Sequence, residues 1–479
     1  MKIAMIASEI APFAKTGGLA DVVGTLAIAL ERYGHELCLI MPAYRSALQG
    51  QFALEETPIK LSVPVSTEQQ TASVFKAAMG KNIAVYLVRA DRYFDRDALY
   101  GTAEGDFVDN AERFTFLSRA ALEILRDQPI DLVHCHDWQA ALTIVFLKTQ
   151  SDRYPSLAAA KTVLTLHNLG FQGIFAAPHW HLLNLDRSLF TPRYLEFYGQ
   201  INFLKGALTF ADKITTVSPS YAQEIMTKDQ GFGLEGVLRQ RARDLTGILN
   251  GVDYNQWSPA TDPHIAQRYS ENNLAAKQSC KKSLQGRVNL PAKSELPLIG
   301  IISRLTAQKG FDLIEKIFDR LMEQEIQLVL LGSGESRYEE YFRLAASRFP
   351  DKVAVRIGFD EVLAHQIEAG ADLFLMPSLY EPCGLNQMFS LRYGTIPIVR
   401  AVGGLKDTVA PIDPVKSGGT GFVFGPYEPA ALWETIEAAL RFYQDKTAWS
   451  DVQRRAMRMD FSWDRSAQAF SHLYGQLLG

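Results

Sequence analysis

The sequence predicts an α/β protein built from two Rossmann-like domains, and three observations support this fold class. First, short apolar runs typical of buried parallel strands alternate with segments of helical periodicity along most of the 479 residues. Second, the alternation begins again after Asn250, which predicts one domain over residues 1–250 and a second over residues 251–460. Third, polar residues directly follow several strands, and ligands of doubly wound sheets bind outside the carboxyl ends of strands.

The first domain is predicted to open with a strand, a loop and a helix. Residues 2–7 form a short apolar run, and residues 8–18 form the loop after it. Apolar residues then recur at helical spacing from Leu19 to Leu30, and Gly34 supplies the C-terminal stop. Further strands are predicted over residues 37–41, 130–135, 162–166 and 213–217.

The second domain is predicted to repeat the same pattern after a polar segment. Residues 258–296 contain three prolines and are predicted to form a linker with a short helix. Strands are then expected over residues 296–303, 328–331, 353–357, 373–376 and 396–399. Residues 462–478 form an amphipathic pattern, which predicts a closing helix over the third region, residues 461–479.

Composition and charge exclude several classes of protein. Lys and Arg number 49 against 53 Asp and Glu, without a basic run, so the chain lacks the electrostatic footprint of a protein that binds nucleic acid or an anionic membrane. Its cysteines are scattered and form no C-x-x-C pair, which favours a reducing compartment: they are Cys38, Cys135, Cys280 and Cys383. Glu9 interrupts the apolar N-terminus, and no apolar window reaches 18 residues. We therefore expect a soluble, cytoplasmic protein.

The loop after the first strand is a candidate anion site. It ends in Lys15, Thr16, Gly17 and Gly18, immediately before the first helix. Two glycines let the backbone approach a ligand closely, and a helix start offers N–H donors and a positive dipole. The alternative is a tight turn with a solvated lysine, and the sequence matches neither a Walker loop nor the G-x-G-x-x-G fingerprint.

Two loops of the second domain carry similar chemistry. Arg304 and Lys309 lie on one short loop after a strand, where they could neutralise a departing diphosphate. Glu381 precedes a helix start at Cys383, Gly384 and Leu385, whose amides suit a phosphate while the carboxylate suits a sugar hydroxyl. The alternatives are two surface cations and an acidic helix start favoured by the macrodipole alone.

Histidines follow two strands of the first domain. His134 and His136 alternate on one strand, so both are expected on one face, and His167 ends the next strand. Their spacing matches no recognised zinc motif, and we expect no metal. Asp137 and His167 are better explained as groups that bind a sugar or stabilise developing charge. Cys383 is interpreted as structural, because the sequence positions no base beside it.

Seven motifs together are far more specific than any one of them. They occur in this order: K-T-G-G-L-A-D, H-C-H-D-W-Q-A, L-H-N-L-G-F-Q-G, I-L-N-G-V-D-Y-N-Q-W-S-P, S-R-L-T-x-Q-K-G, E-P-C-G-L-N-Q-M and Y-G-T-I-P-I-V-R-A-V-G-G-L-x-D-T-V. This set resembles the bacterial glycogen synthases and plastid starch synthases, which are family-five retaining glycosyltransferases. The resemblance covers essentially the whole chain.

The resemblance implies a fold, a reaction and partners. The fold is GT-B, in which two Rossmann-like domains face a central cleft, with the nucleotide sugar on the C-terminal domain, the acceptor on the N-terminal domain and the last helix packed back on the latter. The reaction transfers glucose from ADP-glucose to the non-reducing 4-hydroxyl of an α-1,4-glucan with retention and without metal or cofactor. The implied location is the cytoplasm, or a plastid stroma after processing if the source is a plant.

The same resemblance implies roles for individual residues. Lys15 and the amides of Gly17 and Gly18 would meet the ADP phosphates or glucose. Arg304 and Lys309 would hold the diphosphate as it leaves, and Glu381 would bind glucose hydroxyls. The amides of Cys383, Gly384 and Leu385 would bind phosphate. Asp137 and His167 would touch the transferred glucose. The remaining expected positions are Asn250 in the hinge motif, Phe359 stacked on adenine, and Tyr93 against the acceptor.

One departure and several rivals remain at this stage. Many relatives in the wider superfamily carry a second Glu eight positions after the first, where this chain has Phe389, and nearby Gln387 is a candidate to share its hydrogen bonding. No enzyme nucleophile is evident, so a front-face displacement is favoured over a covalent one. The first rival is another GT-B enzyme, for instance one that uses UDP-glucose or a small-molecule acceptor. The second is a catalytically silent, glucan-binding or regulatory protein on this fold. The third is an NAD-dependent oxidoreductase, which the missing G-x-G-x-x-G disfavours.

Overall fold

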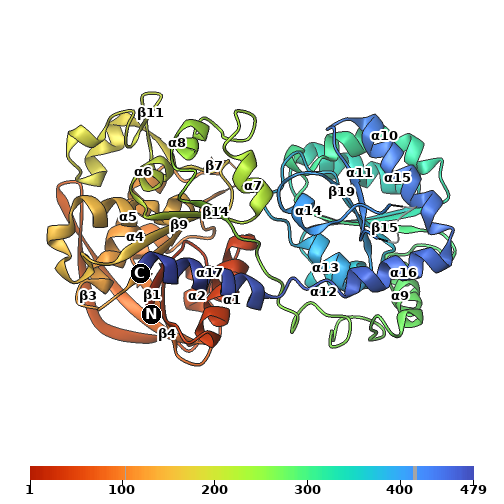
Figure 1. The fold of residues 1–479 in the computed structure, drawn as a ribbon, viewed down its shortest axis with the longest axis horizontal. Helices are drawn as coiled ribbons and strands as arrows, with labels where there is room; N and C mark the ends of the chain where they lie inside the picture. Colours follow the sequence, from red (N-terminus) through yellow and green to blue (C-terminus); the bar gives the residue numbers. More distant parts are fainter. Residues whose placement is uncertain (103, 414–417) are drawn as a thin grey trace. The chain divides into compact units, whose positions relative to one another are not determined.

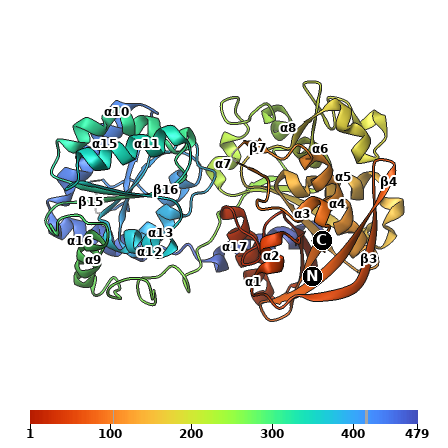
Figure 2. The ribbon, with the colours of Figure 1, turned by 180° about the vertical axis from the view of Figure 1, so that it is seen from behind.

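A computed structural model describes residues 1–102, 104–413 and 418–479. The chain divides into two compact units (Figures 1 and 2). Unit 1 comprises Met1–Gly251 together with Trp463–Gly479, and unit 2 comprises Val252–Ser462. The divisions fall after Gly251 and after Ser462, beside the boundaries predicted at residues 250 and 460. Each unit has its own sheet with helices on both faces.

The sheet of unit 1 has nine strands in the order β14-β13-β9-β8-β1-β2-β5-β4-β3. Seven of them run parallel: β1 (Lys2–Ile6), β2 (Glu36–Pro42), β5 (Ile83–Arg89), β8 (Leu132–His136), β9 (Lys161–Leu166), β13 (Lys213–Thr216) and β14 (Leu245–Gly247). An antiparallel hairpin that the sequence analysis did not predict extends one edge, and its strands are β3 (Glu55–Val65) and β4 (Glu68–Met79).

The helices of unit 1 include one from each end of the chain. They are α1 (Gly18–Arg32), α2 (Arg45–Gln49), α3 (Asp91–Phe94), α4 (Asn110–Leu125), α5 (Asp137–Thr149), α6 (Phe203–Phe210), α7 (Pro219–Glu224), α8 (Glu235–Gln240) and α17 (Trp463–Leu478). Helix α17 lies beside α1 (Figure 1), where Tyr33 donates a hydrogen bond to the Asp464 carbonyl at 3.1 Å. The C-terminal segment is therefore an integral part of unit 1.

Two small antiparallel sheets also belong to unit 1. One has the order β10-β12-β11, with β10 (Ile174–Ala176), β11 (Glu196–Phe197) and β12 (Gln200–Asn202), and the other pairs β6 (Gly101–Thr102) with β7 (Gly105–Asp106). The first of them follows the loop after β9. It was not predicted from the sequence.

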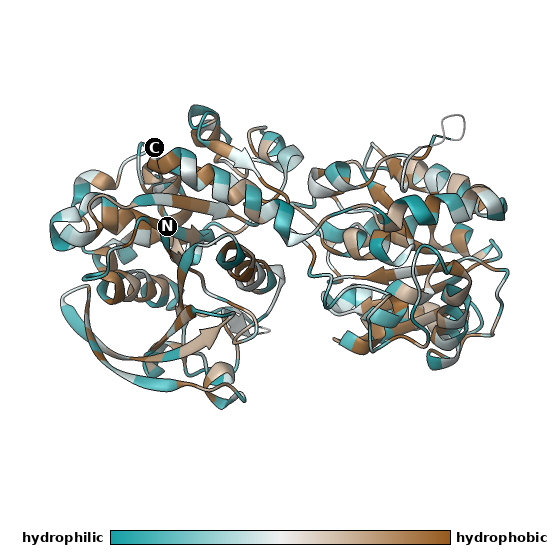
Figure 3. Cartoon of the chain, turned by 60° about the horizontal axis from the view of Figure 1, so that its bottom comes forward, coloured by the Kyte–Doolittle hydropathy of each residue, from teal (hydrophilic) through white to brown (hydrophobic). Residues whose placement is uncertain are grey.

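Unit 2 has a six-stranded parallel sheet in the order β17-β16-β15-β18-β19-β20. Its strands are β15 (Leu298–Ile302), β16 (Gln327–Gly332), β17 (Val353–Ile357), β18 (Leu373–Met376), β19 (Ile396–Arg400) and β20 (Phe422–Phe424). Its helices are α9 (Lys277–Arg287), α10 (Phe311–Met322), α11 (Ser336–Arg348), α12 (Glu361–Gly370), α13 (Asn386–Tyr393), α14 (Gly403–Thr408), α15 (Pro429–Tyr443) and α16 (Lys446–Met457). Apolar residues concentrate on the central strands, and polar residues on the outward helix faces (Figure 3).

The polar segment at the start of unit 2 was predicted to be a linker, but its side chains pack against the rest of unit 2. Trp257 lies flat between the rings of His365 and Phe389, at centroid distances of 3.8 and 4.2 Å. Asp262 is buried and accepts hydrogen bonds from His365 and from the Tyr393 hydroxyl. The segment packs because these few side chains find buried partners, and the same stack explains the apolar residue at position 389.

Each sheet reverses its strand order at one point. In unit 2, β15, β16 and β17 extend to one side and β18, β19 and β20 to the other, so the reversal lies between β15 and β18. In unit 1 the reversal lies between β1 and β8. Doubly wound sheets bind ligands in the crevice that opens at the carboxyl ends of the strands beside such a reversal. This rule directs attention to the loops after β1, β8, β15 and β18.

Candidate functional site

In unit 1 the loop after β1 is held by a buried carboxylate that the sequence analysis did not single out. Glu9 accepts hydrogen bonds from the Thr16 backbone amide, from the Thr16 hydroxyl at 2.8 Å and from the Tyr100 hydroxyl at 2.6 Å. These bonds fix the end of the loop against the start of α1. The signal that identified Asp137, a polar residue directly after a buried strand, could have identified Glu9 as well.

The start of α1 is exposed at Gly17 and Gly18. Gly17 is its N-cap, and no side chain of the described residues caps the helix. A Cβ atom on Gly17 would meet no heavy atom of the described residues within 4 Å, and its φ of −161° is open to any residue, so packing among these residues does not require glycine here. Lys15 is exposed and lies 2.9 Å from Asp21. A glycine that the fold does not need, at an uncapped helix start beside a cation, fits close approach by an anionic ligand.

Asp137 lies at the carboxyl end of β8, in a conformation that aspartate adopts rarely. Its φ is +55°, and its buried side chain accepts a hydrogen bond from the His167 backbone amide at 2.7 Å. Burial raises the pKa of Asp137 to about 7, and the charge of Glu9 acts in the same direction, while backbone hydrogen bonds from His167 and Asn168 oppose both. Strain and a perturbed pKa at one residue are typical of a functional carboxyl group.

The histidines form a buried network that runs from α17 to the end of β9. Nδ1 of His136 lies 3.0 Å from Nε2 of His167, and the rings of His134 and His136 lie 4.2 Å apart, which confirms that they share one face. Nδ1 of His134 lies 2.8 Å from the Tyr474 hydroxyl. Burial lowers the pKa of His134 and of His167 to about 3, so both imidazoles are neutral at physiological pH. Nowhere in the described ranges do three or more His, Cys, Asp or Glu residues form a group that could hold a metal ion.

In unit 2 the strand-order reversal brings Lys309 and Glu381 into direct contact. The Lys309 ammonium lies 2.6 Å from Glu381 Oε2, with only 18% and 7% of the two side chains exposed, and Ser378 donates a further hydrogen bond to the same oxygen. The two loops pack tightly, because a Cβ on Gly310 would lie 2.1 Å from the Pro377 carbonyl oxygen. Arg304 is on the same loop as Lys309 and is exposed. Ser378 was missed, although it too follows a strand.

Gln387 stabilises the turn from Cys383 to Leu385 through hydrogen bonds of its side-chain amide. The Gln387 amide donates to the carbonyls of Cys383 and Gly384 at 3.1 and 3.0 Å, and to the Thr408 hydroxyl at 3.1 Å. Gly384 has a φ of +71°, and α13 begins just after Leu385 without a side-chain cap. The side-chain nitrogen of Gln387 therefore supports the loop, while its buried Oε1 accepts no hydrogen bond from the described residues, and the direct sugar contact considered from the sequence stays a prediction.

Gly404 should tolerate no side chain. A Cβ there would lie 2.0 Å from the Cys383 carbonyl oxygen, a backbone atom that can move only with the loop carrying Glu381. We expect Gly404→Ala to lower the free energy of unfolding by about 2 kcal/mol and the rate of the reaction at this site at least about tenfold. Gly425→Ala is the matched control, since a Cβ at Gly425 meets nothing within 4 Å. Equal denaturant midpoints and rates for the two variants would contradict the prediction.

The three remaining predicted positions lie in different surroundings. Phe359 follows β17 and is 85% exposed, so its ring is available to stack on a flat ligand. Asn250 is buried at the end of unit 1. Tyr93 is fully buried, and its hydroxyl donates to Glu112 at 2.5 Å. This position does not favour the acceptor contact expected of Tyr93, because neither its ring nor its hydroxyl reaches the surface.

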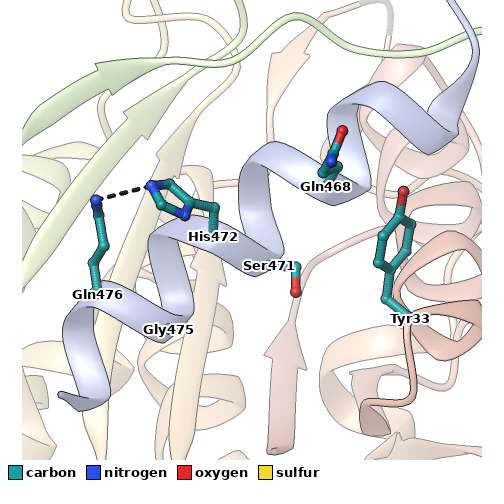
Figure 4. Close-up of a pocket in the computed structure, with 6 residues that line it drawn as sticks. All are labelled: Tyr33, Gln468, Ser471, His472, Gly475 and Gln476. Carbon is teal, nitrogen blue, oxygen red and sulfur yellow. Dashed lines mark hydrogen bonds between the residues drawn. The ribbon is translucent and has the colours of Figure 1, made fainter.

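A surface hollow of about 510 Å³ lies at the other end of α1 (Figure 4). It is lined by Tyr33, Gln468, Ser471, His472, Gly475 and Gln476. Because α1 begins at the carboxyl edge of the sheet and Tyr33 follows its last residue, this hollow is at the opposite edge from Gly17, Asp137 and His167. It is separate from the candidate site of unit 1.

Comparison with known proteins agrees with this architecture. Residues 2–240 match the family model described as starch synthase catalytic domain, and residues 285–455 match glycosyl transferases group 1. Glycogen synthases from Koribacter versatilis (strain Ellin345) and Anaeromyxobacter sp. (strain Fw109-5) are each 48% identical, with 99% and 100% of this chain covered and 98% and 99% of theirs.

Solved structures agree as well. The catalytic domain of starch synthase IV from Arabidopsis thaliana, bound to ADP and acarbose, is 34% identical over 99% of both chains with a TM-score of 0.91. Sucrose-phosphate synthase from Thermosynechococcus elongatus, at 18% identity over 99% of this chain and 98% of that one, has a TM-score of 0.62 and shows the shared fold alone.

Two Rossmann-type units, each with polar loops at its strand-order reversal, define a two-domain glycosyltransferase of GT-B-like architecture. Within that class, the chain belongs to the glycogen and starch synthase family. The fold class and the family predicted from the motifs are thus confirmed. In the part of the chain that the structure describes, no helix has the length and apolar character needed to cross a membrane.

Proposed function

We propose that this enzyme transfers glucose from ADP-glucose to the non-reducing 4-hydroxyl of an α-1,4-glucan, with retention of configuration and without a metal ion. The observation that carries the proposal is the Lys309–Glu381 pair at the strand-order reversal of unit 2. Lys309 supplies a cation that can stabilise a leaving diphosphate, and Glu381 supplies a carboxylate that can accept hydrogen bonds from sugar hydroxyls. The pair lies at the position where doubly wound sheets bind ligands. The family relationship and a relative bound to ADP support the choice of donor.

On the donor side, each residue contributes according to its charge and place. Lys309 and exposed Arg304 attract the diphosphate, and the uncapped start of α13 at Gly384 and Leu385 adds backbone amides. Glu381 accepts hydrogen bonds from glucose hydroxyls once Lys309 turns toward the phosphates. The exposed ring of Phe359 stacks on adenine, a flat aromatic base.

In unit 1, the proposed contacts gather at the carboxyl ends of β1, β8 and β9. The uncapped start of α1 at Gly17 and Gly18, together with Lys15, meets the donor phosphates or glucose. Asp137 and the neutral imidazole of His167 contact the transferred glucose. The hinge role that the resemblance implies for Asn250 stays a prediction; Asn250 lies beside the division between the two units.

The chemistry follows from the charges that develop. Breaking the bond between the anomeric carbon and the diphosphate oxygen leaves the electron pair on the phosphate and positive charge on the sugar ring. Lys15, Arg304, Lys309 and two helix starts supply the positive charge that the phosphate needs, which is why we propose that no metal ion is required. The acceptor oxygen attacks from the leaving-group face, and its proton passes to the departing phosphate, so configuration is retained. Asp137 in its ionised form stabilises the sugar cation.

The test is glucose transfer to glycogen from labelled ADP-glucose and UDP-glucose in parallel, with and without EDTA. We expect incorporation at least about tenfold faster from ADP-glucose, unchanged by EDTA, with an α-configured new linkage in the NMR spectrum of the product. Incorporation from UDP-glucose alone would overturn the donor, and loss with EDTA would overturn metal independence. Glycogen binding without incorporation from either donor would identify a silent glucan-binding protein. We also propose a cytoplasmic location, which the scattered cysteines and the bacterial relatives support.

A further inference from the structure

Three aromatic side chains of unit 1 are exposed on neighbouring loops. Phe171 is 55% exposed, Tyr198 82% and Phe232 39%. Phe171 lies on the loop after β9, Tyr198 in the turn between β11 and β12, and Phe232 in the segment before α8. We call these three residues the aromatic rim. Exposed large aromatic rings are unfavourable in water, so a group of them marks a surface that binds something.

Contacts beneath the rings bring the three loops together. A Cβ on Gly233 would lie 2.8 Å from the Phe197 ring and 3.6 Å from the Tyr198 ring, so the Phe232 loop meets the Tyr198 turn. Gln172, buried and adjacent to Phe171, donates to the Phe232 carbonyl at 3.1 Å and accepts from Asn202 at 2.6 Å. Asn202 belongs to β12, the strand that follows Tyr198. The buried side chain of Gln172 therefore connects all three loops through its hydrogen bonds.

Two rim residues occupy backbone conformations that aromatic residues avoid. Tyr198 has a φ of +50° and is followed by Gly199 at +81°, and Phe232 has a φ of +48° and is followed by Gly233 at +83°. The Tyr198–Gly199 pair is a two-residue hairpin loop, because Phe197 pairs with Gln200, and such loops with two positive φ angles prefer Asn-Gly. The ring of Tyr198 is exposed, so burial of this ring does not offset the energetic cost of its backbone conformation. Strain retained at an exposed ring indicates a functional constraint.

We propose that the aromatic rim binds an α-1,4-glucan chain by stacking pyranose faces on its rings, as an extension of the acceptor site. Aromatic faces suit the C–H faces of sugar rings, and their side chains lose little entropy on binding because they have only two rotatable bonds. The position supports a glucan, since residues 167–171 form one continuous loop from His167 to Phe171. The choice of ligand rests on the proposed function.

The first test separates a binding role from a structural one. Asparagine suits a left-handed conformation, so Tyr198→Asn and Phe232→Asn relieve strain while they remove the rings. We expect unchanged or higher melting temperatures together with roughly tenfold weaker binding of maltoheptaose, measured by calorimetry on the full chain. Tyr33→Ala is the matched control, an exposed tyrosine at the opposite edge of the sheet. Unchanged binding in both asparagine variants, or an equal loss in Tyr33→Ala, would overturn the proposal.

The second test uses kinetics, so that failure of the rim and failure of the proposed function are distinguishable. In Tyr198→Asn and Phe171→Ala we expect KM for glycogen to rise about tenfold while KM for ADP-glucose stays within about twofold. If the unaltered enzyme transfers glucose and both variants keep its KM for glycogen, the proposed binding of glucan to the aromatic rim is wrong. If the unaltered enzyme transfers no glucose, the proposed function is wrong, and calorimetry with maltoheptaose still tests whether the aromatic rim binds a glucan. A change of molecular mass in the variants, measured by light scattering, would instead identify a second copy of the chain as the occupant and overturn the proposal.

Discussion

Lys309→Ala is expected to lower kcat/KM for glucosyl transfer by about 10²- to 10³-fold, the largest loss that we predict for a single substitution. The Lys309 ammonium lies in a largely buried position against Glu381, where little water is present to screen its charge. Removal of this cation deprives the leaving diphosphate of a stabilising partner that acts more strongly in the transition state than in the ground state. The loss should therefore fall mainly on kcat.

Two further variants make this result interpretable. Loss of Lys309 leaves Glu381 without its ion-pair partner, which destabilises the fold, so thermal denaturation must show that the variant is folded at the assay temperature. Glu381→Gln is the milder partner variant, because the amide can still accept from Lys309 and from Ser378, and we expect about a tenfold to hundredfold loss. Lys316→Ala, an exposed lysine on α10, is the control. A folded Lys309→Ala enzyme with control-like kcat would contradict the assignment.

Asp137→Asn is expected to lower kcat/KM about 100-fold above pH 8 and to abolish its rise with pH near 7. The pKa of Asp137 is raised to about 7 because the carboxyl group is buried. The ionised form, which stabilises the sugar cation, therefore predominates only above about pH 7 in the free enzyme. In the unaltered enzyme kcat/KM should rise with pH through about 7, because this parameter reports the pKa values of the free enzyme, and in Asp137→Asn that rise should vanish. A pH profile of kcat/KM for both enzymes and for the exposed-carboxyl control Asp152→Asn checks this; a persistent rise near pH 7 in Asp137→Asn would contradict it.

The same shift predicts how stability depends on pH. Between about pH 4 and about pH 7 the folded state keeps the Asp137 proton while the unfolded chain has lost it. The unfolded state therefore binds fewer protons, and this residue makes the free energy of unfolding fall as the pH rises across that range. The difference in unfolding free energy between the unaltered enzyme and Asp137→Asn, from denaturant titrations at pH 5 and pH 8, should shift in favour of the variant at pH 8. A difference that is independent of pH would contradict the burial of this carboxyl group.

Much of the fold was predictable because buried parallel strands carry a strong signal. The predicted strands 353–357 and 373–376 coincide with β17 and β18, since both are short apolar runs flanked by helical periodicity. The β3–β4 hairpin was missed because its exposed face carries polar residues such as Lys60 and Ser62, and proline occurs within β3. Strands of this kind are stabilised by pairing with a neighbour, here β5, which a local pattern does not reveal.

The candidate site was predictable in its residue types but not in its contacts. Polar residues after apolar runs identified Asp137, His167, Lys309 and Glu381, and the family resemblance added Phe359. The same signal was present at Glu9 and Ser378 and was overlooked there. The acceptor contact that the resemblance implies for Tyr93 stays a prediction, and the structure adds that this tyrosine is buried against Glu112.

The sequence by itself determined the α/β class, the two-unit organisation of the pattern and the family, because strand and helix periodicities and ordered motifs are local properties of the chain. Only the tertiary structure decided that Lys309 contacts Glu381 across 72 residues and that Tyr474 of the last helix contacts His134. It also decided that burial holds the Asp137 pKa near 7 and that three distant loops form the aromatic rim. Ion pairs, desolvation and backbone strain depend on neighbours in space, and strand order sets those neighbours.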